Sequence, residues 1–265
     1  MILLVTKGLL APALLAACTL AGRRWGTLVG GWLLGLPLIS GPVSYFLLVQ
    51  NGSRFAEGAA RGALLGMLGT GVFFVLYALL AKNRPWWQTL PVSAVAAVAV
   101  TVALTQVHPD LVVAAMVAVG FLALITVVVG RPFDAVPAPA AKLHTVFVRM
   151  AFASAMVVGV TLASTELGSQ VSGMLTAIPI ISAMMAVSTH RSAGGESVRG
   201  LVRGAVAGLW GGAAFFVVVA SLITGAAPPL TYLAATVAAA VAAGACGGLM
   251  AHARPYPSSL PRYSA

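Results

Sequence analysis

Long apolar segments follow one another along almost the whole chain, and they constrain the fold more than any other feature of the sequence. Only 8% of the 265 residues are charged, whereas 60% are hydrophobic. A soluble domain carries roughly 25% charged residues, so this chain has too little polar surface to fold in water. Because a membrane-spanning helix needs about 20 apolar residues, the sequence predicts an all-α, polytopic membrane protein.

The apolar segments divide into nine predicted transmembrane helices. Joints that contain proline, glycine or charged residues separate them, and the longest joint is "RPFDAVPAPAAK" at 131–142. The expected helices cover residues 2–21, 26–48, 57–81, 88–106, 111–130, 143–164, 168–189, 199–222 and 230–251.

Nine spans would separate the basic residues almost completely. Twelve of the 15 Lys and Arg residues would lie on one face of the membrane, and only Lys7, Arg54 and Arg61 on the other. Basic residues collect on cytoplasmic loops, so we expect the N-terminus outside and the C-terminus inside. The net charge of +10 is then explained by anionic lipid headgroups and does not require a nucleic-acid partner.

Two stretches that lie 142 positions apart are similar without a gap. Residues 31–75 match residues 173–217 at 15 of 45 positions, and Pro37 pairs with Pro179. Five helices separate equivalent points, and an odd number reverses the direction of insertion. We therefore expect two inverted four-helix repeats joined by a linker helix. The expected parts are a first repeat at 1–106, a linker helix and cytoplasmic loop at 107–142, a second repeat at 143–251 and a cytoplasmic tail at 252–265.

A proline lies at the centre of the second helix of each repeat. Pro37 and Pro179 each remove an N–H group and free the carbonyl four residues earlier. A freed carbonyl is costly in lipid unless protein, a hydroxyl or water satisfies it, and Ser40 and Ser182 are candidates one turn later. A single kink fits packing as well as function, but two symmetric kinks at mid-depth favour a central substrate cavity or a hinge.

Two basic residues add to the predicted substrate site. Lys7 and Arg149 occupy equivalent positions about two turns into the first helix of each repeat. They either snorkel to the nearer surface or bind an anion along the pathway. The predicted substrate-binding residues are Lys7, Pro37, Ser40, Tyr45, Arg149, Thr176, Pro179 and Ser182.

Glycines recur at three- and four-residue spacing in two equivalent helices. The stretches are "GALLGMLGTG" at 62–71 and "GAVAGLWGG" at 204–212. Small residues at this spacing let helices approach closely in a membrane, so both stretches predict helix-packing faces rather than ligand contacts.

The sequence contains little that points to catalysis or metal binding. Its five acidic residues and four histidines lie near helix ends or in loops, and Cys18 and Cys246 lie in apolar segments. Neither paired carboxylates nor a Cys/His cluster nor a nucleophile with an adjacent base is recognisable. We therefore expect no enzymatic activity, no metal and no cofactor.

The first half carries a series of motifs in a fixed order. It begins with the early basic residue Lys7 and the basic pair at 23–24, followed by "GGWLLGLPLIS", the turn at Gly52, "RGALLG" and "FFVLYALL". In this order each half resembles the GlpM-like family of small bacterial four-helix membrane proteins, over about residues 5–106 and more loosely over 147–251. The element "IPIISA…HRSAGG" is similar to duplicated bacterial membrane proteins. The inverted plan is similar to that of the drug/metabolite transporter superfamily, from which the chain departs by lacking a tenth helix.

These features predict a multi-pass transporter of the bacterial cytoplasmic membrane that works by alternating access. An interior with basic but few acidic residues favours a small anionic or lipid-linked substrate, as in a flippase. The expected partners are membrane lipids and this substrate, with a homodimer left open. A non-transporting membrane partner or assembly subunit is the main alternative, and a channel is another.

The predicted inversion can be tested by cysteine labelling. A cysteine placed at Asn51, in a chain whose own two cysteines are replaced by serine, should react with an impermeant reagent added outside the cell. A cysteine at the equivalent position, Ala193, should not react. Labelling of both positions from the same side would contradict the inverted arrangement.

Overall fold

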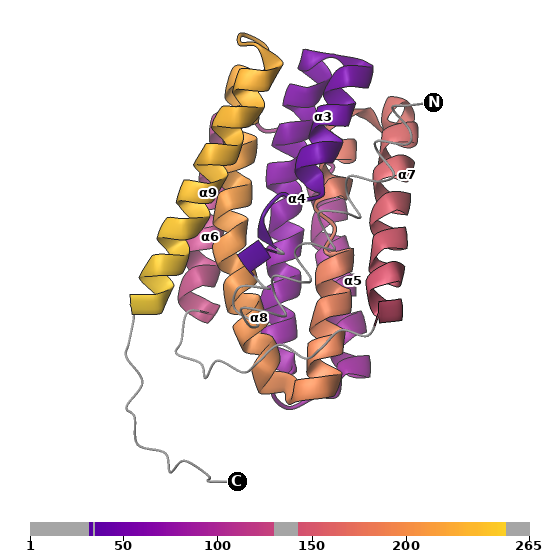
Figure 1. Cartoon of the computed structure of the whole chain (residues 1–265), viewed down its shortest axis with the longest axis vertical. Helices are drawn as coiled ribbons and strands as arrows, with labels where there is room; N and C mark the ends of the chain where they lie inside the picture. The colour runs from indigo at the N-terminus through magenta and orange to yellow at the C-terminus, as the bar shows by residue number, and fades with distance from the viewer. Residues whose placement is uncertain (1–31, 34, 130–142, 253–265) are drawn as a thin grey trace.

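The structure is a computed structural model that describes residues 32, 33, 35–129 and 143–252 (Figure 1). Every regular element in these ranges is an α-helix, which confirms the all-α prediction for this part of the chain. The predicted helix at 2–21 lies outside the described residues. The helices are α3 (Ser40–Asn51), α4 (Ser53–Leu80), α5 (Trp86–Leu104), α6 (Leu111–Val129), α7 (Leu143–Thr176), α8 (Ile180–Leu222) and α9 (Pro228–His252).

Within the described residues, five helical stretches are long and apolar enough to cross a membrane, in agreement with a membrane protein. They are Ser53–Leu80, Trp86–Leu104, Leu111–Val129, Ser182–Leu222 and Pro228–Met250. Their ends lie within a few residues of the predicted boundaries, apart from the joined helices that make up α8.

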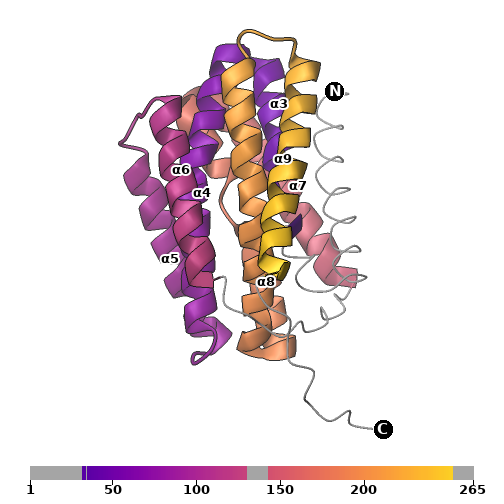
Figure 2. The same cartoon turned by 90° about the vertical axis from the view of Figure 1, so that its left-hand side faces the viewer.

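Two helices form the centre of the bundle and the others surround them (Figure 2). The most apolar windows of α4 and α8 are 72% and 67% buried, against 17% for α5 and 22% for each of α6 and α9. The buried core consists mainly of alanine and branched aliphatic side chains, together with five aromatic side chains of the two central helices: Phe73, Phe74, Tyr77, Phe215 and Phe216.

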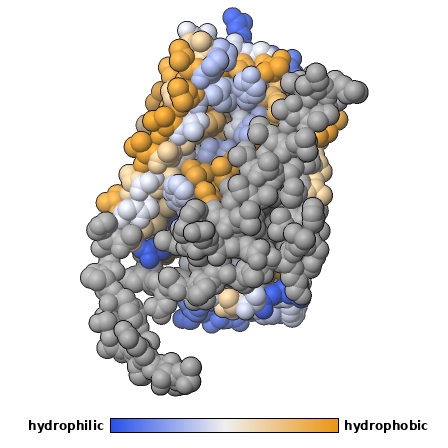
Figure 3. Space-filling model, viewed as in Figure 1, coloured by the Kyte–Doolittle hydropathy of each residue, from blue (hydrophilic) through white to orange (hydrophobic). Residues whose placement is uncertain are grey.

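The outer helices expose apolar side chains along their length. Val95 of α5, Val127 of α6 and Leu233 of α9 are each more than half exposed. Figure 3 shows apolar residues along the flank that includes α9, whereas hydrophilic residues gather toward the two ends of this face. An apolar flank between polar ends is the surface that a lipid bilayer stabilises.

Two predicted helices are interrupted at their prolines. The chain is not helical at 36–39, around Pro37, and α3 begins only at Ser40. In the second half, α7 ends at Thr176, and α8 begins at Ile180, directly after Pro179. The two prolines therefore break their helices, whereas Pro91 lies within the continuous helix α5.

Both interruptions close with the same main-chain hydrogen bond. The N–H of Leu38 donates to the carbonyl of Leu36 at 2.8 Å, and the N–H of Ile180 donates to the carbonyl of Ile178 at 2.9 Å. A bond between residues two apart defines a γ-turn, and Pro179 at its centre has φ −82° and ψ 47°, near the inverse form. Proline favours this turn because its ring holds φ near −65°.

Three glycines reverse or redirect the chain where helices meet. Gly52 (φ 84°), Gly168 (φ 73°) and Gly194 (φ 79°) adopt a left-handed conformation that side chains disfavour. Gly52 separates α3 from α4, and Gly194, 142 residues later, divides α8 into two arms at 180–193 and 195–222. Figure 1 shows the chain reversing direction between these two arms at the lower end of the bundle.

The central helices touch the interrupted segments through glycine. A Cβ atom at Gly66 of α4 would lie 2.8 Å from the carbonyl oxygen of Met174. A Cβ atom at Gly208 of α8 would overlap the carbonyl oxygen of Trp32. Residues 66 and 208 are 142 apart, as are residues 32 and 174, so the same backbone contact occurs twice.

The next glycine on each central helix contacts an outer helix in the same register. A Cβ atom at Gly69 would lie 2.9 Å from the carbonyl oxygen of Ala97 in α5, and one at Gly211 would lie 2.6 Å from that of Ala239 in α9. Both pairs are again related by 142 positions. The prediction that these glycines form helix-packing faces is confirmed.

Alanine at either contact glycine should destabilise the protein. Gly66→Ala and Gly208→Ala would each force a methyl group against backbone, at an expected cost of about 1–3 kcal/mol. Gly120 of α6 is the matched control, because a Cβ atom there meets nothing within 4 Å. Gly120→Ala should be neutral or stabilise by up to about 1 kcal/mol. Unfolding in detergent, followed by circular dichroism, measures the differences, and equal effects at all three positions would contradict the close packing.

Candidate functional site

The predicted anion-binding pair is only partly within the described residues. Lys7 lies outside them, and the main chain of Arg149 is described in α7 but its side chain is not. The hypothesis that these two residues bind an anion therefore stays a prediction.

Five of the remaining predicted residues lie at the two interruptions. Pro37 lies within the first and Ser40 directly follows it, and Pro179 lies within the second, with Thr176 just before it and Ser182 shortly after it. The side chain of Ser182 is buried, with 6% exposed, and the other four are partly buried. Each interruption packs against one central helix, the first on α8 and the second on α4.

The carbonyl groups that the second interruption frees have identifiable donors. The carbonyl of Leu175 accepts the N–H of Ile178 at 3.2 Å, and the carbonyl of Ala177 accepts the hydroxyl of Thr70 from α4. The donor to Leu175 is therefore main chain, and not the hydroxyl of Ser182 that the sequence suggested. This bond joins residues three apart, as in a 3₁₀ turn, and it tightens the end of α7 just before the break.

Two helix N-termini begin at these interruptions. α3 starts at Ser40, and the first arm of α8 starts at Ile180. Neither start has a side-chain cap, and neither helix has an acidic residue in its first turn. The partial positive charge of each helix N-terminus is therefore not neutralised by its own first turn, and it favours a nearby anion.

Tyr45 belongs to a different contact. Its ring is 44% exposed and meets the ring of Tyr232 edge-on at 5.4 Å. The neighbouring hydroxyl of Ser44 lies 2.9 Å from the Tyr232 hydroxyl. Tyr45 thus packs α3 against α9, whereas the other predicted residues lie at the interruptions.

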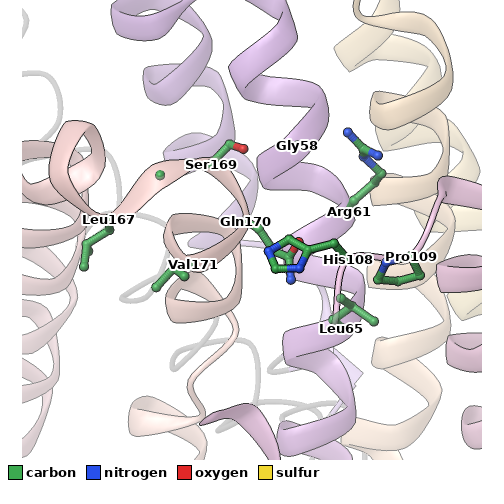
Figure 4. A pocket seen from close by; sticks show the side chains of 10 residues that line it. Gly58, Arg61, Leu65, His108, Pro109, Leu167, Ser169, Gln170 and Val171 are labelled. Atoms are coloured by element: carbon green, nitrogen blue, oxygen red, sulfur yellow. The ribbon is translucent and has the colours of Figure 1, made fainter. Parts of the chain in front are cut away.

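A pocket of about 340 Å³ lies near the N-terminal end of α4 (Figure 4). It is formed where α4, the connection between α5 and α6, and the bend of α7 at Gly168 meet. None of the six predicted residues whose side chains the structure describes lines it. The lining residues are Gly58, Arg61, Leu65, His108, Pro109, Leu167, Gly168, Ser169, Gln170 and Val171.

Among the lining residues that the structure describes, Arg61 alone carries a formal charge at neutral pH. Its Nη2 atom lies 3.6 Å from Oε1 of Glu57, one turn earlier on α4. Its Nε atom is buried and has no hydrogen-bond partner in the described part of the chain. Gln170 links the other two segments of the lining, because its Nε2 atom donates to the carbonyl of Val107 at 2.7 Å.

The equivalent arginine of the second half is bound differently. Arg203 lies 142 positions after Arg61, and its Nη2 atom donates to the carbonyl of Met250. Met250 in turn lies 142 positions after His108, which lines the pocket beside Arg61. In both halves, therefore, the arginine lies near the equivalent residue, His108 or Met250. In the second half the arginine donates a hydrogen bond to the main-chain oxygen of that residue.

The pocket was not predicted from the sequence, although one signal in the sequence pointed to it. The lining comes from three segments that lie far apart in the chain, and only the fold brings them together. The signal was the retention of arginine at equivalent positions 61 and 203 in two apolar helices, in a chain with few charged residues.

No protein-family model, no curated protein and no solved structure matches this chain. The resemblance of each half to the GlpM-like family and the similarity in plan to the drug/metabolite transporter superfamily therefore stay predictions. Function has to be inferred from the geometry of the chain itself.

Removing the Thr70 hydroxyl should destabilise the second interruption. Thr70→Val keeps the shape of the side chain but leaves the Ala177 carbonyl without this donor, at an expected cost of about 1 kcal/mol. Thr70→Ser should restore most of the loss. Thr236→Val is the control, because this exposed hydroxyl bonds only within its own helix, to Tyr232. Unfolding in detergent gives the comparison, and equal losses for Thr70→Val and Thr236→Val would exclude a special role for Thr70.

Proposed function

We propose that this chain is a transporter that works by alternating access in the bacterial cytoplasmic membrane. The observation that carries the proposal is the pair of helix interruptions at Pro37 and Pro179, which share one turn geometry and one register. Non-helical backbone at membrane depth is tolerated where protein or a water-filled cavity surrounds it. In many transporters, such discontinuous helices form the substrate site.

The proposed architecture is two inverted repeats in a chain of nine spans, with the N-terminus outside and the C-terminus inside. The glycine contacts, the γ-turns and the positive-φ glycines that recur 142 positions apart support it. The positions of the equivalent helices also support it. In Figure 1, α3 occupies the upper half of the bundle, and the first arm of α8 occupies the lower half. Exchange of conformation between inverted halves is a direct route to alternating access.

The proposed substrate is a small or lipid-linked anion, moved in a flippase-like manner. The N-terminal ends of α3 and of the first arm of α8 would stabilise its negative charge at the interruptions. Lys7 and Arg149 would add a cation on each side of the pathway. Membrane lipids are the expected surroundings, and also the source of the substrate if it is lipid-linked.

A scaffold or assembly subunit explains the interruptions less well. Breaking a helix costs hydrogen bonds and needs dedicated partners such as Thr70, and a protein that only associates through its faces gains nothing from it. A channel would also use such breaks, but it would show flux that does not saturate with substrate.

Replacing either proline should impair transport while the protein stays folded. Pro37→Ala and Pro179→Ala allow the helix to continue, so each should reduce flux of an anionic or lipid-linked substrate into vesicles by about tenfold or more, which corresponds to about 1.4 kcal/mol in the barrier. Pro91→Ala is the matched control, because Pro91 is exposed and lies within a continuous helix. The measurement is flux into vesicles that contain purified protein, across a panel of small anions and fluorescent anionic lipids.

The same panel separates the alternatives. If the parent protein moves none of the substrates, and the proline variants change only stability, the scaffold interpretation replaces the transporter. If flux rises linearly with concentration and is unaffected by the proline variants, a channel is the better description.

A further inference from the structure

We propose that the Arg61 pocket is a binding site for an oxyanion, a carboxylate or phosphate-type group attached to an apolar body. This site is distinct from the interruptions, since it is lined by none of the residues predicted there. Under the proposed orientation it faces the outside, where it would dock an anion before transport.

The lining of the pocket matches such a ligand. Arg61 supplies the positive charge, and Ser169 supplies a hydroxyl group at the start of the helical segment that follows Gly168. Leu65 and Leu167 supply apolar surface, which favours an organic anion over a bare inorganic one. The exposure of His108 and Leu167 leaves the pocket open to the surroundings.

Arg61 has unused capacity to bind an anion. A charge-assisted hydrogen bond between nitrogen and a carboxylate oxygen is about 2.7–2.9 Å long. The 3.6 Å separation from Glu57 is longer than this, so the ion pair holds the guanidinium loosely. A guanidinium has five N–H donors arranged to fit carboxylate or phosphate, and an anion in the pocket would use donors that Glu57 leaves free.

In the second half, the arginine equivalent to Arg61 binds a main-chain oxygen atom. Arg203 donates to the main-chain oxygen of Met250, and the equivalent residue to Met250 in the first half is His108. In the first half a pocket lies between the equivalent residues, and Arg61 and His108 both line it. A ligand oxygen would therefore take the place that a carbonyl oxygen fills beside Arg203.

Glu57 is the acidic residue that would compete with a ligand for Arg61. The proposal therefore predicts the direction in which each loss of charge changes ligand binding. Two more acidic residues lie near the pocket. Asp110 is engaged elsewhere, because its Oδ1 atom accepts the N–H of Val113 at 2.8 Å at the start of α6. Glu166 is exposed and directly precedes Leu167, the first lining residue of α7. Removing the charge of Glu57 should therefore strengthen binding, whereas removing that of Arg61 should abolish it.

The test is a ³¹P NMR titration of the purified full chain in an uncharged detergent. Two probes distinguish the sources of the oxyanion: phenyl phosphate for a soluble ligand, and dihexanoyl phosphatidic acid for a lipid headgroup. Arg61→Gln should weaken binding by at least about tenfold, since it removes charge-assisted hydrogen bonds. Glu57→Gln should tighten binding several-fold. Arg54→Gln is the matched control, because Arg54 is an exposed arginine at the same end of α4, and it should change binding by less than about twofold.

Each outcome decides the proposal. Saturable, Arg61-dependent binding of both probes assigns a general oxyanion site, and binding of one probe alone identifies the soluble or the lipid source. Equal loss for Arg54→Gln and Arg61→Gln would show that the effect is one of surface charge and would overturn the site, as would no binding by the parent protein.

If Arg61→Gln does not fold, the Glu57→Gln variant decides, because weaker or unchanged binding by that variant would contradict competition between Glu57 and the ligand for Arg61. Binding is measured without vesicles, so failed transport would leave this site standing, and failed binding would leave the transporter proposal standing.

Discussion

A main-chain carbonyl that loses its helical partner inside an apolar bundle has to find another donor, and this requirement shapes the centre of the molecule. At the second interruption the N–H of Ile178 and the hydroxyl of Thr70 provide the donors for two such carbonyls. One donor comes from the tightened end of α7 directly before the proline, and the other comes from α4, which packs against the interruption. The interruption is thus compatible with an apolar environment, which a simple kink without partners would not be.

The glycine faces of α4 and α8 are what bring those partners close enough. Gly66 lies one turn before Thr70, and a side chain at Gly66 would collide with the carbonyl of Met174. Any larger residue there would push the second interruption away and remove Thr70 from the reach of Ala177. Close helix packing and the hydrogen bonding of the freed carbonyl groups therefore depend on the same few residues. This explains why glycine and proline positions recur together in the two halves.

The sequence predicted the parts of this structure that depend on local chemistry. Proline without an N–H group and glycine with positive φ act within a few residues, so the interruption at Pro37 and the turn at Gly52 could be expected from composition and spacing. The role of Thr70 could not, because it depends on a contact with a residue 107 positions away, and its equivalent in the second half is Gly212. The Arg61 pocket was missed for the same reason, and Tyr45 was grouped with its neighbours in sequence although its ring packs on Tyr232 of a distant helix.

The two arginines connect the pocket to the proposed mechanism. If inverted halves exchange conformations, the half that now holds Arg203 against Met250 would open, and Arg61 would approach the carbonyl of His108. An oxyanion beside Arg61 occupies the position that this carbonyl would need, so it would favour the conformation in which the pocket is open. A ligand shifts such an equilibrium only by its difference in affinity for the two states. Release of the anion from Arg61 toward the interruptions would remove that preference and permit the exchange, which couples movement of the ligand to movement of the halves.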